Sequence, residues 1–435
     1  MADYRKVLVV GLGVSGLAAA KLLLDLGAAV VGYDQAPLPA ALPPEMTLVA
    51  AVDAVDWNEL DCLVTSPGVA PSHPFIVQAR ARGLEIIGEV ELALRHLYNP
   101  SIGITGTNGK TTVTMLTAHV LNSCGRPAHA VGNVGDPLST YVGMPANDIL
   151  VVELSSYQLE TLTTPAFDAA ALLNITPDHL DRYKDMEEYA RAKASLQHCM
   201  KDSANFFVEE VAAVAWRELF ALPPKTFGFS QKADYSFAQE SSCRGKNIEY
   251  NIPERYKNLR EIDRANALAS LLLCHTVGVE VEEFWRAYAS FVKPPYRLER
   301  VAEHNGVAFI DDSKGTNVDA VVKAVESVEG PIVLIAGGVD KGSSYTVWKE
   351  AFKGRVKAVC SIGEAAEKIA KELGDDFDVR MMEKMDDAVV QAYLLAQPKG
   401  SVLLSPGCSS FDMFRNYAHR GDVFKDLVRE IIQRS

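Results

Sequence analysis

The sequence has few cysteines, and they show no pattern that indicates a crosslink or a metal site. Seven cysteines are scattered over 435 residues, and no two of them form a Cys-x-x-Cys pair. A disulfide framework and a structural zinc site both depend on closely spaced sets of cysteines. The cysteine pattern therefore indicates neither of these two classes of protein.

Long apolar runs are also missing. No stretch reaches about eighteen apolar residues without a charge, which is the length that a membrane-spanning helix needs. The first residues, MADYRKVLVVGLG, lack the apolar region and the small-residue cleavage site of a signal peptide. We therefore expect a soluble cytoplasmic protein with no membrane insertion.

Basic charge is scarce as well. The chain has 43 Lys and Arg against 56 Asp and Glu, which gives a net charge of −13. A nucleic-acid-binding protein would show a basic face, so we expect no nucleic acid among the partners. Anionic small ligands are compatible with this charge only if helix N-termini, a few placed cations or metal ions hold them.

Short apolar runs alternate with helix-like segments three times along the chain, which is typical of a parallel α/β sheet. The first series begins with an apolar strand at 6–10 and a helix at 15–27, and the second begins with a strand at 101–105. A polar stretch at 230–258 reads as irregular, and the Pro-Pro segment at 292–300 reads as a linker before the third series. We therefore predict an α/β fold of three units, at 1–94, 95–293 and 294–435.

The first glycine motif, GLGVSG at 11–16, follows a predicted strand and opens a predicted helix. Gly11, Gly13 and Gly16 fit the spacing of a dinucleotide-binding turn, and Asp34 ends the next strand, where an acid reaches a ribose hydroxyl. The pattern favours a nucleotide with a diphosphate but does not say which one. A tight strand-to-helix turn without a ligand is the alternative.

The second motif, TGTNGKTT at 105–112, resembles a P-loop without its first glycine, because Ile104 occupies that position. Backbone N–H groups around Gly106 and Gly109 would cradle phosphates, Lys110 would neutralise them and Thr111 would bind Mg²⁺. The alternative is a plain Gly/Thr turn with a solvated lysine. A phosphate loop leaves a ligase or kinase, an ATPase and a GTP switch open, but no Asn-Lys-x-Asp motif of a GTPase occurs.

Three further residues of the central part are candidates for chemistry. Glu153 ends an apolar strand, where a carboxylate can hold magnesium, although a salt-bridged strand end is the alternative. His179 lies on a turn beside Asp178 and Asp181 and reads more simply as a surface or capping residue. Lys193 lies on a predicted helix and reads from composition as a solvated lysine.

Eight phrases, in this order, resemble the Mur ligase family: TGTNGKTT, ELSSYQLE, LNITPDHLDRY, RAKASL, NALAS, PYRLE, DDSKGTN and LLSPGCSSFDMF. They span nearly the whole chain. The resemblance implies a Rossmann-like N-terminal domain, a central P-loop ATPase-type domain and a Rossmann-like C-terminal domain. The segment LSPGCSSFDMFRNYAHRGDVF is most similar to the members that add D-glutamate, and the Asn-Pro-Arg signature of the members that add a diamino acid is absent.

The family consists of ATP-dependent amide-forming ligases of cytoplasmic peptidoglycan precursor synthesis. The resemblance implies that ATP converts the terminal carboxylate of UDP-N-acetylmuramoyl-L-alanine to an acyl phosphate, which the amine of D-glutamate attacks, giving ADP and phosphate. It also implies two Mg²⁺ ions, and we expect a monomer. The implied catalytic residues are Lys110, Glu153, His179, Lys193 and Lys314.

The resemblance assigns the remaining site residues by position. The implied ATP-binding residues are Gly106, Thr107, Asn108, Gly109, Lys110, Thr111, Thr112, Asn266, Arg297, Asp312 and Lys314. The implied metal ligands are Thr111, Glu153, His179 and Lys193, the last as a carbamate. The residues implied for the UDP substrate are Ser15, Asp34, Gln35, Gly68, Asn133 and His179. Those implied for D-glutamate are Thr316, Lys341, Ser410, Phe411 and Tyr417.

The sequence departs from the family before Asn266, where REIDRAN replaces the usual Gly-x-His-Asn phrase, and this leaves the packing around adenine open. Another Mur-type or a folylpolyglutamate-type ligase shares the ATP machinery and is the closest alternative. An NAD-dependent oxidoreductase would explain the first glycine motif but not the second. A nucleotide sensor without catalysis would leave Glu153 and Lys314 unexplained.

Overall fold

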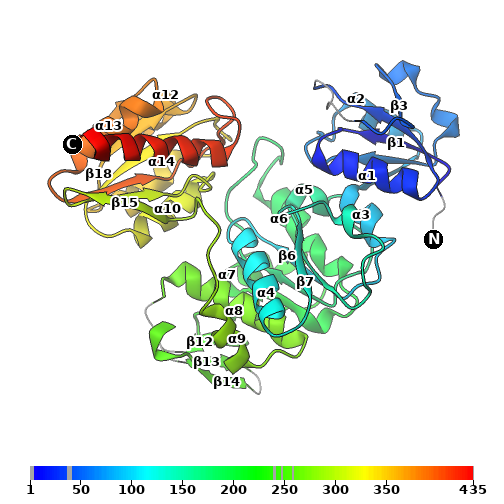
Figure 1. Cartoon of the computed structure of the whole chain (residues 1–435), viewed down its shortest axis with the longest axis horizontal. Helices are drawn as coiled ribbons and strands as arrows, with labels where there is room; N and C mark the ends of the chain where they lie inside the picture. The colour runs from blue at the N-terminus through cyan, green and yellow to red at the C-terminus, as the bar shows by residue number, and fades with distance from the viewer. Residues whose placement is uncertain (1–3, 37–41, 239–241, 246–247, 257–258, 435) are drawn as a thin grey trace. The chain divides into compact units, whose positions relative to one another are not determined.

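The computed structural model describes residues 4–36, 42–238, 242–245, 248–256 and 259–434. Their strands form three separate sheets (Figure 1). By its internal contacts the chain divides into two units. The first unit consists of Met1–Ile175 and Glu187–Phe291, and the second consists of Thr176–Met186 and Val292–Ser435. The chain therefore passes from one unit to the other three times.

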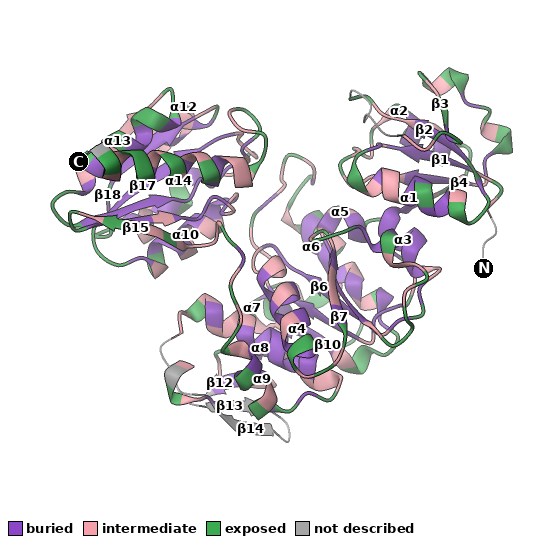
Figure 2. Cartoon of the chain, in the orientation of Figure 1, coloured by how far each residue is buried: buried purple, intermediate pink, exposed green. Residues whose placement is uncertain are grey.

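The first sheet has five parallel strands in the order β3-β2-β1-β4-β5. The strands are β1 (Lys6–Val10), β2 (Ala29–Tyr33), β3 (Thr47–Leu48), β4 (Cys62–Thr65) and β5 (Glu85–Gly88). Successive side chains of a strand point to opposite faces of a sheet. Val7 of β1 packs in the core that contains α1 (Val14–Asp25), whereas Leu8 packs in the core that contains α2 (Pro74–Ala81). Both faces of this sheet are therefore covered, and its central strands β1, β2 and β4 are mostly buried, whereas the edge strand β3 is exposed (Figure 2).

The second sheet has nine strands in the order β14-β13-β12-β11-β10-β9-β6-β8-β7. The strands are β6 (Ser101–Thr105), β7 (Ala128–Gly132), β8 (Ile149–Glu153), β9 (Ala169–Leu172), β10 (Phe206–Glu209), β11 (Lys225–Gly228), β12 (Tyr235–Ala238), β13 (Ser242–Gly245) and β14 (Ile248–Asn251). The strands from β7 to β12 run parallel, and β13 and β14 continue the sheet as antiparallel strands. The prediction of an irregular stretch at 230–258 is therefore wrong for its described residues, because three strands extend the sheet there.

Helices build separate cores with the second sheet. One core contains residues of α4 (Lys110–Ser123), α8 (Glu261–Thr276) and α9 (Val281–Tyr288). The other core contains residues of α3 (Glu89–Leu94), α5 (Ser156–Leu159) and α7 (Glu210–Ala215). Because α4 directly follows β6, its N-terminus lies at the carboxyl end of a central strand, which is where ligands of parallel α/β sheets bind.

The third sheet has six strands in the order β15-β16-β20-β17-β18-β19, and β15 is antiparallel to β16 while the other pairs are parallel. The strands are β15 (Glu299–His304), β16 (Val307–Asp311), β17 (Ile332–Gly337), β18 (Val356–Ile362), β19 (Val379–Met381) and β20 (Gly400–Leu404). The helices of its two cores are α10 (Val318–Ser327), α11 (Trp348–Phe352), α12 (Ala366–Leu373), α13 (Met385–Ala396) and α14 (Tyr417–Arg434). The α/β class expected from the sequence is thus present in each of the three sheets.

The segment Thr176–Met186 belongs by contacts to the second unit, although it lies in the sequence between parts of the first. Its first residue, Thr176, donates a hydroxyl hydrogen bond of 3.2 Å to Asp319 on α10. The domain boundaries at 94 and 293 stay predictions, because the contact units place the first and second sheets together.

Among the described residues, no helix has both the length and the apolar composition that a membrane span requires.

Two buried carboxylates on α3 tie it to the region of the second sheet. Glu91, 1% exposed, accepts hydrogen bonds from the main-chain N–H groups of Thr163 and Thr164 at 2.9 and 3.0 Å, from both of their hydroxyls, and from Arg95. Glu89 accepts the N–H of Ser139 at 2.6 Å, and burial raises the pKa of this carboxyl group. The short helix that follows β5 is therefore fixed by ionisable groups as well as by apolar packing.

We predict that Glu91→Ala destabilises the first unit by about 3–5 kcal/mol, because two N–H groups, two hydroxyls and a guanidinium lose their acceptor in a dry site. The free energy of unfolding in urea measures this loss. Glu85→Ala is the matched control, since Glu85 also binds Arg95 but is exposed, and its loss should stay below about 1 kcal/mol. Equal losses in the two variants would show that α3 is not held through Glu91.

Candidate active site

The first glycine motif forms a tight turn between β1 and α1. Gly11 has φ of 87°, in the left-handed region that favours glycine, and its N–H donates to the carbonyl of Tyr33 at 2.8 Å. A Cβ atom at Gly16 would lie 1.8 Å from the carbonyl oxygen of Gly11, so no other residue fits there without a shift of the backbone. The motif therefore brings α1 close to the end of β1.

A pocket of about 720 Å³ opens beside this turn. Four residues expected at the UDP substrate, Ser15, Asp34, Gln35 and Gly68, all line it. The carboxylate of Asp34 accepts the N–H groups of Leu12 and Ala36 at 2.5 and 2.7 Å. The volume is within the range of pockets that hold a nucleotide-sized ligand. Asn133, the other residue of the first unit expected here, is not among the lining residues.

The second glycine motif, residues 105–112, is here called the phosphate loop. Gly106 and Gly109 have φ of 152° and 86°, and Gly109 is the N-cap of α4. The Nζ atom of Lys110 donates to the carbonyls of Gly106 and Thr107, both at 2.8 Å. Thr111 and Thr112 follow in the first turn of α4, whose free N–H groups and dipole favour an anion.

Asn266 of α8 lies against the phosphate loop, as expected for an ATP-binding residue. A Cβ atom at Gly109 would lie 2.6 Å from the Oδ1 atom of Asn266, so the close approach depends on glycine. A small pocket of about 50 Å³ is lined by Asn108, Gly109, Leu173, Asn174, Phe227, Ile262, Ala265 and Asn266. Residue Ile262, from the segment that departs from the family phrase, thus borders the loop.

Glu153 ends β8, which pairs in register with β6 so that Glu153 is opposite Ile104, two residues before Gly106. Its side chain is 2% exposed. One carboxylate oxygen accepts a hydrogen bond of 2.7 Å from the amide of Asn133, and the other, Oε2, is buried with no hydrogen-bond partner among the described residues. A buried carboxylate oxygen without a partner is costly, and a cation beside the phosphate loop would satisfy it.

The oxygen donors present suit Mg²⁺, but protein groups alone do not supply a full set of ligands. Within the described part of the chain, no group of three or more His, Cys, Asp or Glu residues could hold a metal ion by itself. Mg²⁺ commonly takes one or two carboxylates together with water and phosphate oxygens. Glu153 and the hydroxyl of Thr111 therefore suit an ion that also binds a nucleotide.

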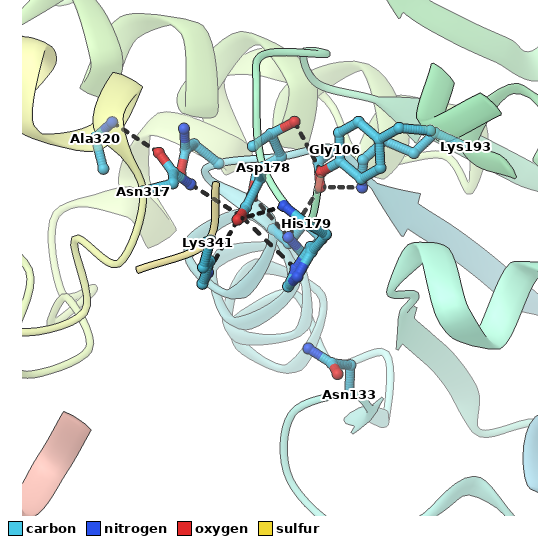
Figure 3. Close-up of polar contacts among 12 residues, drawn as sticks. Gly106, Asn133, Asp178, His179, Lys193, Asn317, Ala320 and Lys341 are labelled. Atoms are coloured by element: carbon cyan, nitrogen blue, oxygen red, sulfur yellow. Dashed lines mark hydrogen bonds and ion pairs between the residues drawn. The ribbon is translucent and has the colours of Figure 1, made fainter. Parts of the chain in front are cut away.

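Lys193 of α6 (Met186–Ala194) is buried, with 1% exposure, and the interpretation from composition as a solvated lysine is wrong. Its Nζ atom donates to the carbonyl of Gly106 at 2.8 Å (Figure 3) and lies 4.7 Å from the centre of the Tyr189 ring. The Tyr189 hydroxyl in turn contacts the Thr107 hydroxyl at 3.1 Å. The structure thus brings Lys110 and Lys193 to the same carbonyl group of the phosphate loop.

His179 belongs to the second unit, and Glu153 and Lys193 belong to the first. The backbone of His179 is left-handed, with φ of 56°, and its N–H donates to the neighbouring Asp178 carboxylate at 2.9 Å. The ring Nε2 atom lies 3.6 Å from the other oxygen of Asp178. The turn therefore holds the imidazole next to a buried carboxylate.

Asp178 connects this turn to the third sheet. Its Oδ1 atom accepts from Nζ of Lys341 at 2.9 Å, and its Oδ2 atom accepts from the side-chain amide of Asn317 at 3.2 Å (Figure 3). Lys341 follows β17, and Asn317 is the N-cap of α10. Sequence reasoning noticed Asp178 only as a neighbour of His179 and missed both contacts, which join residues 163 and 139 positions apart.

Asp312 and Lys314, two residues predicted to bind ATP, follow β16. Asp312 is buried and accepts the Ser405 hydroxyl at 2.8 Å and the N–H of Leu298 at 3.2 Å. Burial raises the pKa of Asp312 to about 7, although the Ser405 hydrogen bond and the charge of Arg297 lower it. Nζ of Lys314 lies 4.1 Å above the ring of Tyr417.

The residues expected at D-glutamate all lie in the second unit, and three loops carry most of them. Thr316 follows β16, Lys341 follows β17, and Ser410 and Phe411 follow β20; Tyr417 begins α14. Ser410 is buried, whereas the Phe411 side chain is 74% exposed. The carboxyl ends of neighbouring parallel strands thus carry these residues, which is where α/β sheets place their ligands.

Sequence reasoning also missed Arg420 of α14, whose guanidinium is fully buried and binds carbonyl groups of two of these loops. No local signal distinguishes this arginine from an exposed one, since most of its neighbours in RNYAHRGD are polar.

Family models cover most of the chain. Residues 5–88 match the Mur ligase MurD-like N-terminal domain, residues 104–271 the Mur ligase middle domain, and residues 296–408 the Mur ligase glutamate ligase domain. Solved structures share the fold over nearly the whole chain. A pseudomurein peptide ligase type C from Methanothermus fervidus has a TM-score of 0.61 at 14% identity, covering 98% of this chain and 100% of that one. UDP-N-acetylmuramate-alanine ligase MurC from Thermotoga maritima has a TM-score of 0.59 at 17% identity, covering 98% and 99%.

The chain therefore belongs to the Mur ligase family of ATP-dependent amide-forming enzymes, and the expected three-domain α/β fold is confirmed. Several relatives match it over the full length under the same name. UDP-N-acetylmuramoylalanine–D-glutamate ligase of Protochlamydia amoebophila is 44% identical and covers 98% of both chains. Proteins of the same name from Geotalea uraniireducens and Chlamydia caviae are 40% and 35% identical, also over 98% of both chains.

The raised pKa of Asp312 predicts how stability changes with pH. An acid that binds its proton more tightly when folded makes the protein lose stability as the pH rises from about 4 to about 7. Asp312→Asn should remove this contribution, so the variant should gain stability relative to the wild type over that range, by at most about 4 kcal/mol. Urea unfolding of both proteins between pH 4 and 8 measures the difference. A difference that does not vary with pH would contradict the prediction.

Proposed function

We propose that the protein ligates D-glutamate to UDP-N-acetylmuramoyl-L-alanine with ATP, through an acyl phosphate, in cytoplasmic peptidoglycan precursor synthesis. The observation that carries this proposal is the full-length match to ligases of that name, at 44% identity over 98% of both chains. The phosphate loop with Glu153 beside it gives the match a chemical basis. Likeness to the solved structures supports the fold, not the choice of substrate.

The reacting groups are both anionic, and this determines what the site must supply. A carboxylate attacks the γ-phosphate of ATP, so cations have to lower the repulsion between them. Lys110 would lie along the β- and γ-phosphates, and Arg297 and Lys314 would approach the transferred phosphoryl group. Two Mg²⁺ ions would supply the remaining positive charge, and the residues predicted as their ligands are Thr111, Glu153, His179 and carbamylated Lys193.

The UDP end of the first substrate would occupy the 720 Å³ pocket, where Ser15, Asp34, Gln35 and Gly68 lie. This pocket holds a group that does not react, so it contributes binding that orients the distant carboxylate. Asn133 and His179 remain predicted residues for this substrate, and the amide of Asn133 binds Glu153 in this structure.

D-Glutamate would bind among Thr316, Lys341, Ser410, Phe411 and Tyr417, and its amine would then attack the acyl phosphate. Lys341 supplies a cation for a carboxylate, but in this structure Asp178 already pairs with it at 2.9 Å. A bound substrate carboxylate would therefore compete with Asp178 or share the lysine with it. The tetrahedral intermediate would collapse with loss of phosphate, leaving the amide.

Other functions would give a role to fewer of the candidate site residues. Another Mur-type or folylpolyglutamate-type ligase would use the same phosphate loop, and the choice depends on the two substrate ends. An oxidoreductase that binds NAD at the first glycine motif would leave Lys110, Glu153 and Lys193 without a role.

Phosphate release tests the proposal. With ATP, Mg²⁺ and UDP-N-acetylmuramoyl-L-alanine, we expect release that requires D-glutamate and is at least about a hundredfold slower with L-glutamate, L-lysine or no amino acid. A coupled phosphate assay measures the rate, and mass spectrometry identifies the product. Release at the same rate without D-glutamate would reject the assignment of the amino acid.

Lys193→Ala should lower kcat by at least about a hundredfold, because a negative metal ligand in the phosphate-transfer site is lost. Lys201→Ala is the control, since Lys201 is an exposed lysine that pairs with Asp168 at the surface. A second readout does not depend on activity. ¹³C NMR of the wild type in ¹³C-bicarbonate should show a carbamate carbon that Lys193→Ala lacks, and a fully active Lys193→Ala enzyme would disprove the carbamate.

A further inference from the structure

Arg420 is a buried cation that no carboxylate neutralises by direct contact. Its side chain is 0% exposed, and among the described residues it forms no ion pair. Five hydrogen bonds instead connect the guanidinium to Ser313, Cys408 and Ser409. Apart from the Ser313 hydroxyl, the acceptors are main-chain carbonyls. A buried charge that is hydrogen-bonded but not paired keeps a positive field around it.

The guanidinium lies next to the three loops that carry most of the residues expected at D-glutamate. Nη2 donates to the carbonyl of Ser313 at 2.9 Å, in the loop that carries Thr316, and Nη1 donates to Cys408 at 3.2 Å, in the loop that carries Ser410. A Cβ atom added at Gly338, three residues before Lys341, would lie 3.3 Å from Nη1. Arg420 is therefore adjacent to each of the three loops that follow β16, β17 and β20.

The neighbouring cations differ from Arg420 in being paired. Lys341 lies 2.9 Å from Asp178, and Lys425 lies 2.6 Å from Glu299 and 3.6 Å from Asp311. Burial lowers the pKa of Arg420 to about 10, which still leaves it charged at neutral pH. Three carboxylates, Asp412, Asp311 and Asp312, act on Arg420 through their charge without contacting it, and burial raises the pKa of Asp311 to about 6 and that of Asp312 to about 7, which weakens the compensation.

We propose that Arg420 determines specificity for an acidic amino acid, by placing an unpaired positive charge behind the loops that would bind the second carboxylate. This inference rests on the proposed function, because it assumes that the three loops bind the incoming amino acid. The role is electrostatic and indirect. Arg420 does not need to touch the substrate, since a charge in a low-dielectric interior acts over several ångströms.

This arrangement would add discrimination to what Lys341 provides. The charge of Lys341 is already partly balanced by Asp178, 2.9 Å away, so a substrate carboxylate would have to share the lysine or compete for it. D-Glutamate carries a second carboxylate, and D-glutamine has a neutral amide of the same size in its place. The positive field of Arg420 stabilises the carboxylate of D-glutamate and has little effect on the neutral amide of D-glutamine. The preference for D-glutamate over D-glutamine should therefore depend on this arginine.

The test compares Arg420→Gln, which removes the charge, with Arg420→Lys, which keeps it but loses the fork of donors. For Arg420→Gln we expect the KM for D-glutamate to rise about tenfold or more, with changes below about twofold in the KM for ATP and in kcat. Arg420→Lys should recover most of the D-glutamate affinity. Thermal unfolding of each variant first establishes that the second unit is folded.

A second pair of variants leaves Arg420 in place and tests the effect of a negative charge beside its guanidinium. The Ser313 hydroxyl accepts from Nε of Arg420 at 3.0 Å, so Ser313→Asp would place a carboxylate beside the guanidinium. Ser313→Asn has the same size without the charge. We expect Ser313→Asp to raise the KM for D-glutamate about tenfold above that of Ser313→Asn.

The outcomes separate the two proposals. If the wild type does not release phosphate in response to D-glutamate, the proposed function fails. If the wild type responds but Arg420→Gln keeps its KM for D-glutamate, or Arg420→Lys is impaired equally, the specificity role of Arg420 is wrong. Equal KM values for Ser313→Asp and Ser313→Asn would also reject it, including in a case where Arg420→Gln does not fold.

Discussion

The carbonyl oxygen of Gly106 is the acceptor around which the phosphate site is built. Lys110 reaches it from the first turn of α4, and Lys193 reaches it from α6, both at 2.8 Å. Two ammonium groups on one oxygen repel each other, and an anion bound at the loop would reduce this repulsion. Conversion of Lys193 to a carbamate would replace the repulsion with attraction. Glu153, with one buried oxygen unsatisfied within the described structure, adds the other half of a cation site.

A net charge of −13 makes the position of each cation important. The molecule concentrates positive field at the carboxyl ends of its sheets, through the N-terminus of α4, the two lysines that bind the Gly106 carbonyl and, in the third sheet, Arg420. Each of these three side chains binds main-chain carbonyls, whose dipoles are fixed by strands and tight turns. The acidic surface elsewhere does not cancel them, because solvent and salt screen exposed charges far more than buried ones.

Features that depend on neighbours in sequence could be predicted, and features that depend on distant contacts could not. Strand, glycine turn and helix specify the phosphate loop and the turn at Gly11, and four predicted residues line the pocket there. The burial of Lys193 was missed because it results from a contact with Gly106, 87 positions away. The contacts of Arg420 with Ser313 span 107 positions, and no local pattern encodes them. Strands β12, β13 and β14 were missed because these short segments become strands only by pairing, β12 with β11, β13 with β12 and β14 with β13.

The chain passes between the two units three times, so a single cut in the backbone does not separate them. A protease that cuts within 292–296 would leave both units joined by the segment Thr176–Met186, whose two ends lead back into the first unit. A fragment that begins at Val292 would lack Asp178 and would leave Lys341 without that carboxylate. The second unit is thus not one continuous stretch of sequence, because eleven of its residues, Thr176–Met186, are encoded between the two parts of the first unit.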